Sequence, residues 1–152
     1  MGIEKMAVLG AGQMGNGITQ VAACAGIEVV MIDIEQKFVD NGLATIKKSL
    51  SKLVKKDRMS QEDADKARSL ISTSTDRKDC KDVDLVVEAV PEILELKISI
   101  FKELDEICKP GCILATNTSS ISISEIASAT NRSDHVIGMH FMNPVPIMKL
   151  VE

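Results

Sequence analysis

Three glycines that follow the first apolar run of the chain could bind phosphate. Gly10, Gly12 and Gly15 form the pattern G-x-G-x-x-G directly after residues 5–9. Gly10 permits a tight turn, Gly12 lets the backbone approach a pyrophosphate, and Gly15 lets a helix and a strand pack closely. Backbone N–H groups and the positive end of the following helix would then face the anion. The pattern alone is a weak signal, but its place between a predicted strand and a predicted helix favours a dinucleotide site.

An acid follows this turn at the end of the next apolar run. Asp33 lies 18 residues after Gly15, where a carboxylate can accept hydrogen bonds from the adenine-ribose hydroxyls and would repel a 2′-phosphate. NAD is therefore favoured over NADP, and Lys37 is the nearby cation that could weaken this preference. The alternative is a glycine turn that binds nothing, with Asp33 capping a helix. The order of strand, glycine turn, helix and acid favours the NAD site. Its turn residues are Gly10, Ala11, Gly12, Gln13, Met14 and Gly15.

Alternating strands and helices must position these residues. Short apolar runs predict strands over 5–9, 29–32, 84–90, 112–116 and 136–139, with a weaker candidate at 71–74. Apolar residues at helical spacing predict helices over about 14–25, 39–53 and 94–108, and Ser60 with Asp63 indicates the start of another. Strands that are apolar on both faces are typical of a parallel sheet covered on both sides. We expect an α/β fold, a Rossmann-type doubly wound, mostly parallel sheet, forming one NAD-binding domain over residues 1–152.

The composition argues against several other classes of protein. The 152 residues carry a net charge of −4, which is too mild to indicate nucleic-acid or membrane binding. The longest apolar runs fall short of the roughly 20 residues that cross a bilayer. Four cysteines lack zinc-ligand spacing, so we expect no metal site and interpret them as buried free thiols in a reducing cytoplasm. They are Cys24, Cys80, Cys108 and Cys112.

Later motifs point to a substrate. They are V-E-A-V-P-E at 87–92, N-T-S-S at 117–120, and the stretch from H-F-M-N-P to K-L-V-E at 140–152. Over residues 5–152 they resemble the 3-hydroxyacyl-CoA dehydrogenase family, especially its bacterial 3-hydroxybutyryl-CoA enzymes. The resemblance implies NAD-dependent interconversion of short-chain 3-hydroxyacyl-CoA and 3-ketoacyl-CoA, in fatty-acid and butanoate metabolism. It covers about the first half of a family member. The all-helical second domain, which contacts substrate and forms the homodimer, is expected to lie outside this chain.

The resemblance also implies which residues act on the substrate. A general-base histidine held by a glutamate 12 positions later corresponds to His140 and Glu152. Imidazole titrates near working pH, and a carboxylate can fix its tautomer and stabilise the imidazolium that forms. Without the motif, His140 would more readily be interpreted as a structural histidine at a strand end. Ser119 matches a serine near substrate and nicotinamide, although residues 118–120 could instead form only turn or cap bonds.

Further binding residues follow from the same resemblance. Glu92, Lys97, Asn117 and Asn143 match positions that line the cofactor site, and Asn117 could shape the loop around it. Without the resemblance, Glu92 and Lys97 would be interpreted as an ordinary solvated ion pair at the start of a helix.

Coenzyme A is expected near the long helix over 39–53. Ser49 and Lys56 match its contact positions there, and Ser119 lies nearer the acyl group. Lys48, Lys52 and Lys56 recur at i, i+4 and i+8 on one helix face, where their like charges repel one another. A ligand phosphate would offset this repulsion. A solvated basic face is an equally good interpretation of Lys48 and Lys52.

Other functions stay open at this point. The family includes a lens crystallin, so a non-catalytic protein or a separate NAD-binding module is possible. A 2-hydroxy-acid-type dehydrogenase would use a lysine base, but its serine-glycine-glycine and G-x-x-x-K patterns are missing. Part of a multifunctional fatty-acid oxidation protein is less favoured, because the first strand begins a few residues after Met1. We also expect weak turnover, because Glu152 lies at a terminus where no later residues hold it.

Overall fold

The computed structural model describes residues 2–152 and contains one six-stranded sheet in which every strand pair is parallel. The strand order is β3-β2-β1-β4-β5-β6, which is the order of a doubly wound dinucleotide-binding sheet. The predicted fold class is confirmed. The strands are β1 (Lys5–Leu9), β2 (Glu28–Ile32), β3 (Ile71–Ser74), β4 (Leu85–Glu88), β5 (Ile113–Thr116) and β6 (Val136–Gly138).

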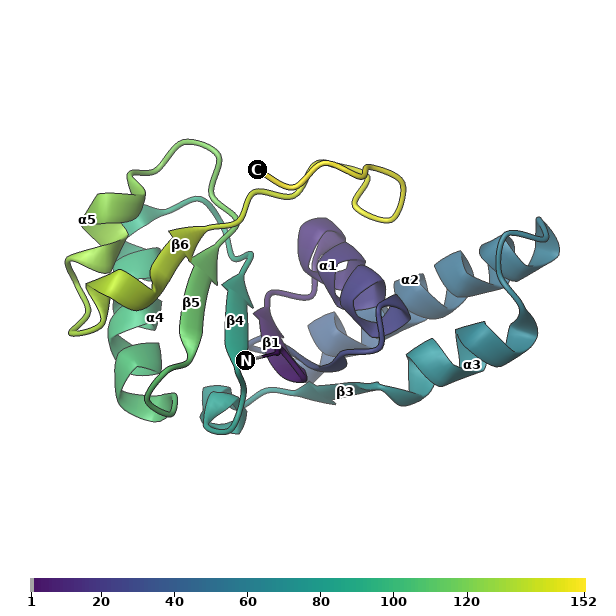
Figure 1. Cartoon of the computed structure of the whole chain (residues 1–152), viewed down its shortest axis with the longest axis horizontal. Coiled ribbons are helices and arrows are strands. Elements are labelled where there is room, and N and C mark those ends of the chain that lie inside the picture. Colours follow the sequence, from purple (N-terminus) through teal and green to yellow (C-terminus); the bar gives the residue numbers. More distant parts are fainter. Residues whose placement is uncertain (1) are drawn as a thin grey trace.

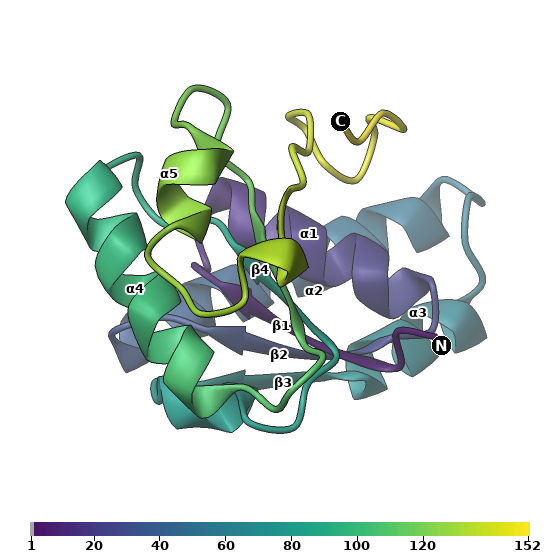
Figure 2. The same ribbon diagram turned by 60° about the vertical axis from the view of Figure 1, so that its left-hand side comes forward.

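Helices cover both faces of this sheet (Figures 1 and 2). On one face lie α1 (Gln13–Cys24), α2 (Gln36–Lys55) and α3 (Gln61–Ser69), and on the other lie α4 (Leu94–Ile107) and α5 (Ile123–Ala127). Two short 3-10 helices, η1 (Arg77–Cys80) and η2 (Ser133–His135), precede β4 and β6. The sequence analysis missed α5, because five residues are too few to show helical periodicity.

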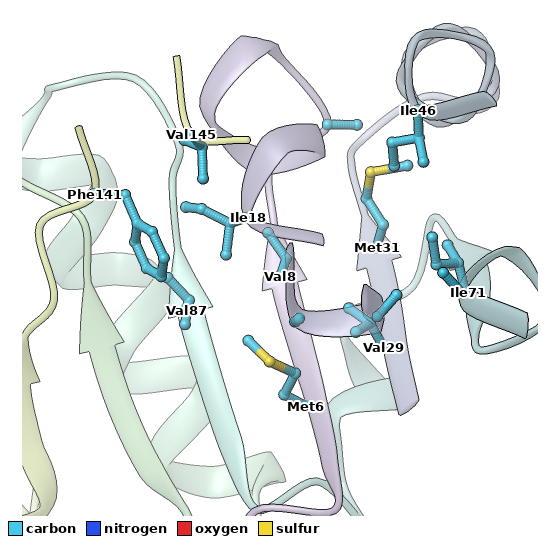
Figure 3. Close-up of a cluster of buried hydrophobic side chains, with 14 of the residues drawn as sticks. Met6, Val8, Ile18, Val29, Met31, Ile46, Ile71, Val87, Phe141 and Val145 are labelled. Atoms are coloured by element: carbon cyan, nitrogen blue, oxygen red, sulfur yellow. The ribbon is translucent and has the colours of Figure 1, made fainter. Parts of the chain in front are cut away.

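Each strand divides its side chains between two apolar layers. In β1, Met6 and Val8 face the layer that contains α1–α3, whereas Ala7 and Leu9 face the layer beneath α4 and α5. Figure 3 shows the first layer, in which side chains from β1, β2, β4, α1 and α2 meet two from the C-terminal segment, Phe141 among them. This two-sided burial explains why the strands lack alternating polar residues.

The cysteines differ in their surroundings. Cys80, Cys108 and Cys112 are buried, as expected, and burial raises the pKa of the Cys80 thiol to about 12. The prediction is wrong for Cys24, the last residue of α1, which is exposed.

Within residues 2–152, no helix combines the length and the apolar character that crossing a membrane requires.

Candidate active site

The glycine turn between β1 and α1 has the geometry that the pattern predicted. Gly10 has a φ of +104°, and a Cβ there would lie 2.5 Å from the carbonyl oxygen of Ala89. A Cβ at Gly15 would lie only 1.8 Å from the carbonyl oxygen of Gly10. A Cβ at Gly12 would meet no atom of residues 2–152 within 4 Å. Two of the glycines are therefore required by the protein's own packing, and Gly12 keeps open space beside the turn.

A fourth glycine near this turn was missed by the sequence analysis. Gly42 is buried in α2, and a Cβ there would lie 2.7 Å from the carbonyl oxygen of Ala11. Because glycine destabilises a helix interior by about 1 kcal/mol relative to alanine, a glycine within an amphipathic helix often has a packing reason. Here the reason is the close approach of α2 to the phosphate-binding turn.

Asp33 connects the end of β2 to the glycine turn. Its Oδ2 accepts a hydrogen bond of 2.8 Å from the backbone N–H of Ala11, and its Oδ1 accepts one of 2.7 Å from Ile34. The N-cap of α2 is Glu35, which makes no side-chain cap bond, so the helix-capping interpretation of Asp33 is wrong. Lys37 lies 3.2 Å from the Glu35 carboxylate, so its charge is already partly offset.

Replacing this acid is expected to change nucleotide preference. Asp33→Asn should weaken NAD binding about tenfold, because a hydrogen bond to a charged acceptor is worth about 1.5–3 kcal/mol. The affinity for NADP relative to NAD should rise, because the charge that repels a 2′-phosphate is removed. Calorimetric titration with each nucleotide measures both effects. Asp40→Asn, an exposed change on α2, is the control, and unaltered NAD affinity in Asp33→Asn would contradict the assignment.

Two adjoining pockets extend from the turn toward the predicted catalytic residues. The first, of about 700 Å³, is lined by the turn and Asp33, and the second, of about 320 Å³, contains His140. They share Met14, Ala89 and Val90, so together they form one elongated site. The second pocket brings together the predicted residues Met14, Glu92, Lys97, Asn117, Ser119, His140 and Asn143.

His140 and Glu152 are paired through both side chain and backbone. The imidazole Nδ1 lies 3.5 Å from Glu152 Oε2, and the two residues exchange backbone hydrogen bonds of 2.8 and 2.9 Å. An antiparallel bridge joins Phe141 to Val151 beside them. Glu152 was expected to fray because no later residues hold it, but its backbone is fixed by pairing with an earlier segment, while its side chain stays 77% exposed.

The segment that carries this pair is tied to the rest of the site. It passes over α1 (Figures 1 and 2), where a Cβ on Gly17 would lie 2.8 Å from the Val145 side chain. Asn117 Oδ1 accepts a hydrogen bond of 2.8 Å from the Phe141 N–H and so holds the start of this segment. Gln13 Nε2 donates to Asn143 Oδ1 at 3.1 Å. The segment that carries His140 is thus fixed both to the end of β5 and to the glycine turn.

The hydroxyl groups of the loop after β5 have different surroundings. The Thr118 hydroxyl donates to Glu92 Oε1 at 2.6 Å and accepts from the Ile121 N–H at 3.0 Å. Ser119 is exposed and lines the pocket, and its hydroxyl makes no hydrogen bond within the described part of the chain. The turn bonds are therefore made by Thr118, and Ser119 presents its hydroxyl to the pocket.

A buried ion pair lies beneath the pocket wall. Lys97 Nζ lies 2.6 Å from Glu88 Oε2 and 3.5 Å from Glu92 Oε1, and the Lys97 and Glu88 side chains are 2% and 0% exposed. The solvated-pair interpretation of Lys97 is therefore wrong, because α4 packs it onto the sheet. Glu88 was missed as a site residue, although an acid inside an apolar strand was a usable signal.

Glu92 is the member of this group that faces the pocket. Partial burial raises its pKa, but the hydrogen bond from Thr118 and the charge of Lys97 outweigh burial and hold the pKa below its usual value. Glu92 is therefore ionised at neutral pH and can only accept hydrogen bonds.

Of the predicted coenzyme A residues, Ser119 lines the pocket with His140, but Ser49 and Lys56 lie elsewhere. Ser49 is half-buried on α2, and Lys56, Lys48 and Lys52 are exposed. Neither Ser49 nor Lys56 lines the pocket that contains His140, so their role stays a prediction.

Comparison with known proteins places these features in a family. The sequence pattern of the 3-hydroxyacyl-CoA dehydrogenase NAD binding domain matches residues 5–152. The chain is 50% identical to the 3-hydroxybutyryl-CoA dehydrogenase of Clostridioides difficile over 148 residues, which are 97% of this chain and 53% of that protein. It is 47% identical to the probable 3-hydroxybutyryl-CoA dehydrogenase of Bacillus subtilis over 152 residues, 100% of this chain and 53% of that protein.

Solved structures agree with the sequence relatives. The crystal structure of (S)-3-hydroxybutyryl-CoA dehydrogenase from Ralstonia eutropha superimposes with a TM-score of 0.96 at 46% identity, covering 99% of this chain and 53% of that one. The chain thus spans about half the length of these relatives. The match over residues 5–152 shows that the chain belongs to the 3-hydroxyacyl-CoA dehydrogenase family and corresponds to its NAD-binding domain.

Proposed function

We propose that this chain is the NAD-binding half of a dehydrogenase that interconverts short-chain 3-hydroxyacyl-CoA, such as 3-hydroxybutyryl-CoA, and the corresponding 3-ketoacyl-CoA. The observation that carries the proposal is that His140, which is paired with Glu152, lines together with Ser119 a pocket continuous with the glycine turn. The names of the relatives above support the substrate class.

In this proposal the imidazole of His140 takes up or releases the proton, and Glu152 orients that imidazole. When Nδ1–H of His140 donates to Glu152, Nε2 is the basic nitrogen that takes the proton of the substrate hydroxyl. The carboxylate of Glu152 then stabilises the imidazolium. The Ser119 hydroxyl can donate to the substrate oxygen, and Asn117 holds the loop that carries His140. Bound NAD would accept the hydride from C3 of the substrate.

Further parts of the proposal concern partners. Ser49 on α2 and Lys56 directly after it would contact coenzyme A, with the acyl end reaching Ser119. The remaining half of the substrate cleft and the homodimer contacts would come from a helical second domain like the one that the resemblance implies. A cytoplasmic location also belongs to this proposal.

The test is a fusion of this chain to the C-terminal half of the Clostridioides difficile relative, assayed for acetoacetyl-CoA reduction by NADH. His140→Asn should lower kcat by about 10³-fold, because general acid–base catalysis contributes about 10²–10⁴. NAD affinity, measured by calorimetry, should stay unchanged.

His135→Asn is the matched control, because His135 pairs with Asp134 at 3.0 Å before β6, away from the pocket. A His140→Asn fusion that keeps wild-type kcat would refute the assignment. The unfused chain should bind NAD but turn over weakly, and a rate equal to that of the fusion would show that residues 2–152 suffice.

A further inference from the structure

The charges beneath the pocket wall do not cancel. Two carboxylates, Glu88 and Glu92, share the single ammonium of Lys97 at 2.6 and 3.5 Å. The group therefore has a net charge of −1, and the pocket that contains His140 is otherwise lined mainly by neutral side chains. Glu152 adds a carboxylate near His140, but its side chain is 77% exposed, so water screens it more strongly.

Glu92 is the most exposed member of this group, although Lys97 also lines the pocket. The oxygens of Glu88 already accept from Thr116 at 2.7 Å, Val90 at 2.8 Å and Lys97. The three N–H donors of Lys97 face Glu88, the Val90 carbonyl at 3.3 Å and Glu92. Glu92 is 42% exposed at the pocket wall. Glu88 can thus influence a ligand only through charge and through Glu92.

A buried ion pair is a poor source of stability, because desolvation offsets the attraction between its charges. An apolar pair of similar volume would pack α4 against β4 equally well. The fixed charge that the group keeps inside the protein is what an apolar pair could not supply. That charge matters for a nicotinamide ring, which carries a positive charge when oxidised and none when reduced.

We infer that the Glu88–Lys97–Glu92 group selects the oxidation state of the cofactor, because its net negative charge favours the cationic nicotinamide of NAD⁺ over the neutral ring of NADH. The inference rests on the proposed function, in which the ring lies in the pocket with His140. Glu88 acts here as a positioning residue, since it sets the charge of the group without touching the ligand.

The test measures the dissociation constants of NAD⁺ and NADH separately, by calorimetry and by NADH fluorescence. Glu92→Gln and Glu88→Gln each change the net charge of the group from −1 to 0. Each should lower the ratio Kd(NADH)/Kd(NAD⁺) about five- to tenfold, as expected for one charge acting over several ångströms at intermediate dielectric. The double variant Glu88→Gln/Lys97→Met has a charge of −1 again, and its ratio should return to within about twofold of the wild type.

Asp84→Asn is the matched control. It removes one carboxylate from an ion pair at the opposite end of β4, where Asp84 lies 2.7 Å from Lys109, and its ratio should not change. Thermal melting confirms folding, and if Glu88→Gln does not fold, Glu92→Gln and the double variant still test the charge rule.

Two results distinguish a failure of this inference from a failure of the proposed function. If both nucleotides bind but the variants change their affinities by equal factors, the charge effect is wrong and dinucleotide binding stands. If the wild-type chain binds neither nucleotide, the proposed function fails together with this inference.

Discussion

Gly15→Ala is expected to lower the free energy of unfolding by about 3 kcal/mol or more and to abolish NAD binding. The added methyl group would lie 1.8 Å from the carbonyl oxygen of Gly10 and 2.6 Å from its carbon. Neither atom belongs to a flexible side chain, so the first turn of α1 must move away from β1. That movement disrupts the N–H groups that would bind the pyrophosphate. Urea denaturation measures the stability and calorimetry measures the binding.

Gly12→Ala is the informative partner of this variant. Gly12 has a φ of −69°, which alanine adopts readily, and an added Cβ meets no atom of residues 2–152 within 4 Å. Stability should stay within about 1 kcal/mol of the wild type, whereas NAD binding should weaken, because the methyl group enters the space that the pyrophosphate needs. Wild-type stability in Gly15→Ala, or wild-type NAD affinity in Gly12→Ala, would refute this description of the turn.

Lys97→Met is expected to lower the free energy of unfolding by about 3–5 kcal/mol, because it leaves the carboxylate of Glu88 buried without its counter-charge. The side chain of Glu88 is 0% exposed, and its remaining donors are the Thr116 hydroxyl and the Val90 N–H. The double variant Glu88→Gln/Lys97→Met should recover most of the loss, because it removes both charges. Chemical denaturation of the two variants and the wild type measures this coupling.

Lys109→Met provides the comparison for an exposed pair. Lys109 and Asp84 are 43% and 27% exposed, so water replaces the lost partner and the unfolding midpoint should change little. Equal losses in Lys97→Met and Lys109→Met would mean that burial does not decide the strength of the Glu88–Lys97 pair.

Local patterns predicted the parts of the site that lie close together in the chain. The three glycines and Asp33 belong to one strand–turn–helix–strand unit, whose geometry follows from residue types at fixed spacing. Every predicted strand is present, although β4 is shorter than the predicted 84–90 and ends at Glu88. The roles of His140, Glu152 and Ser119 came from a family resemblance, because single polar residues after a strand do not specify a reaction.

Other features depend on which strands are neighbours in the sheet. Glu88 and Thr116 are 28 positions apart and are paired across β4 and β5, while Asn117 reaches the Phe141 N–H from the end of β5. The approach of Gly42 to the glycine turn similarly requires α2 to pack beside α1. Hydrophobic periodicity indicates that a strand or helix is buried, but it does not indicate which element covers it. Residue type and spacing thus decided the fold class and the glycine turn, whereas the packing of distant elements decided the buried charges and how the segment that carries His140 is held.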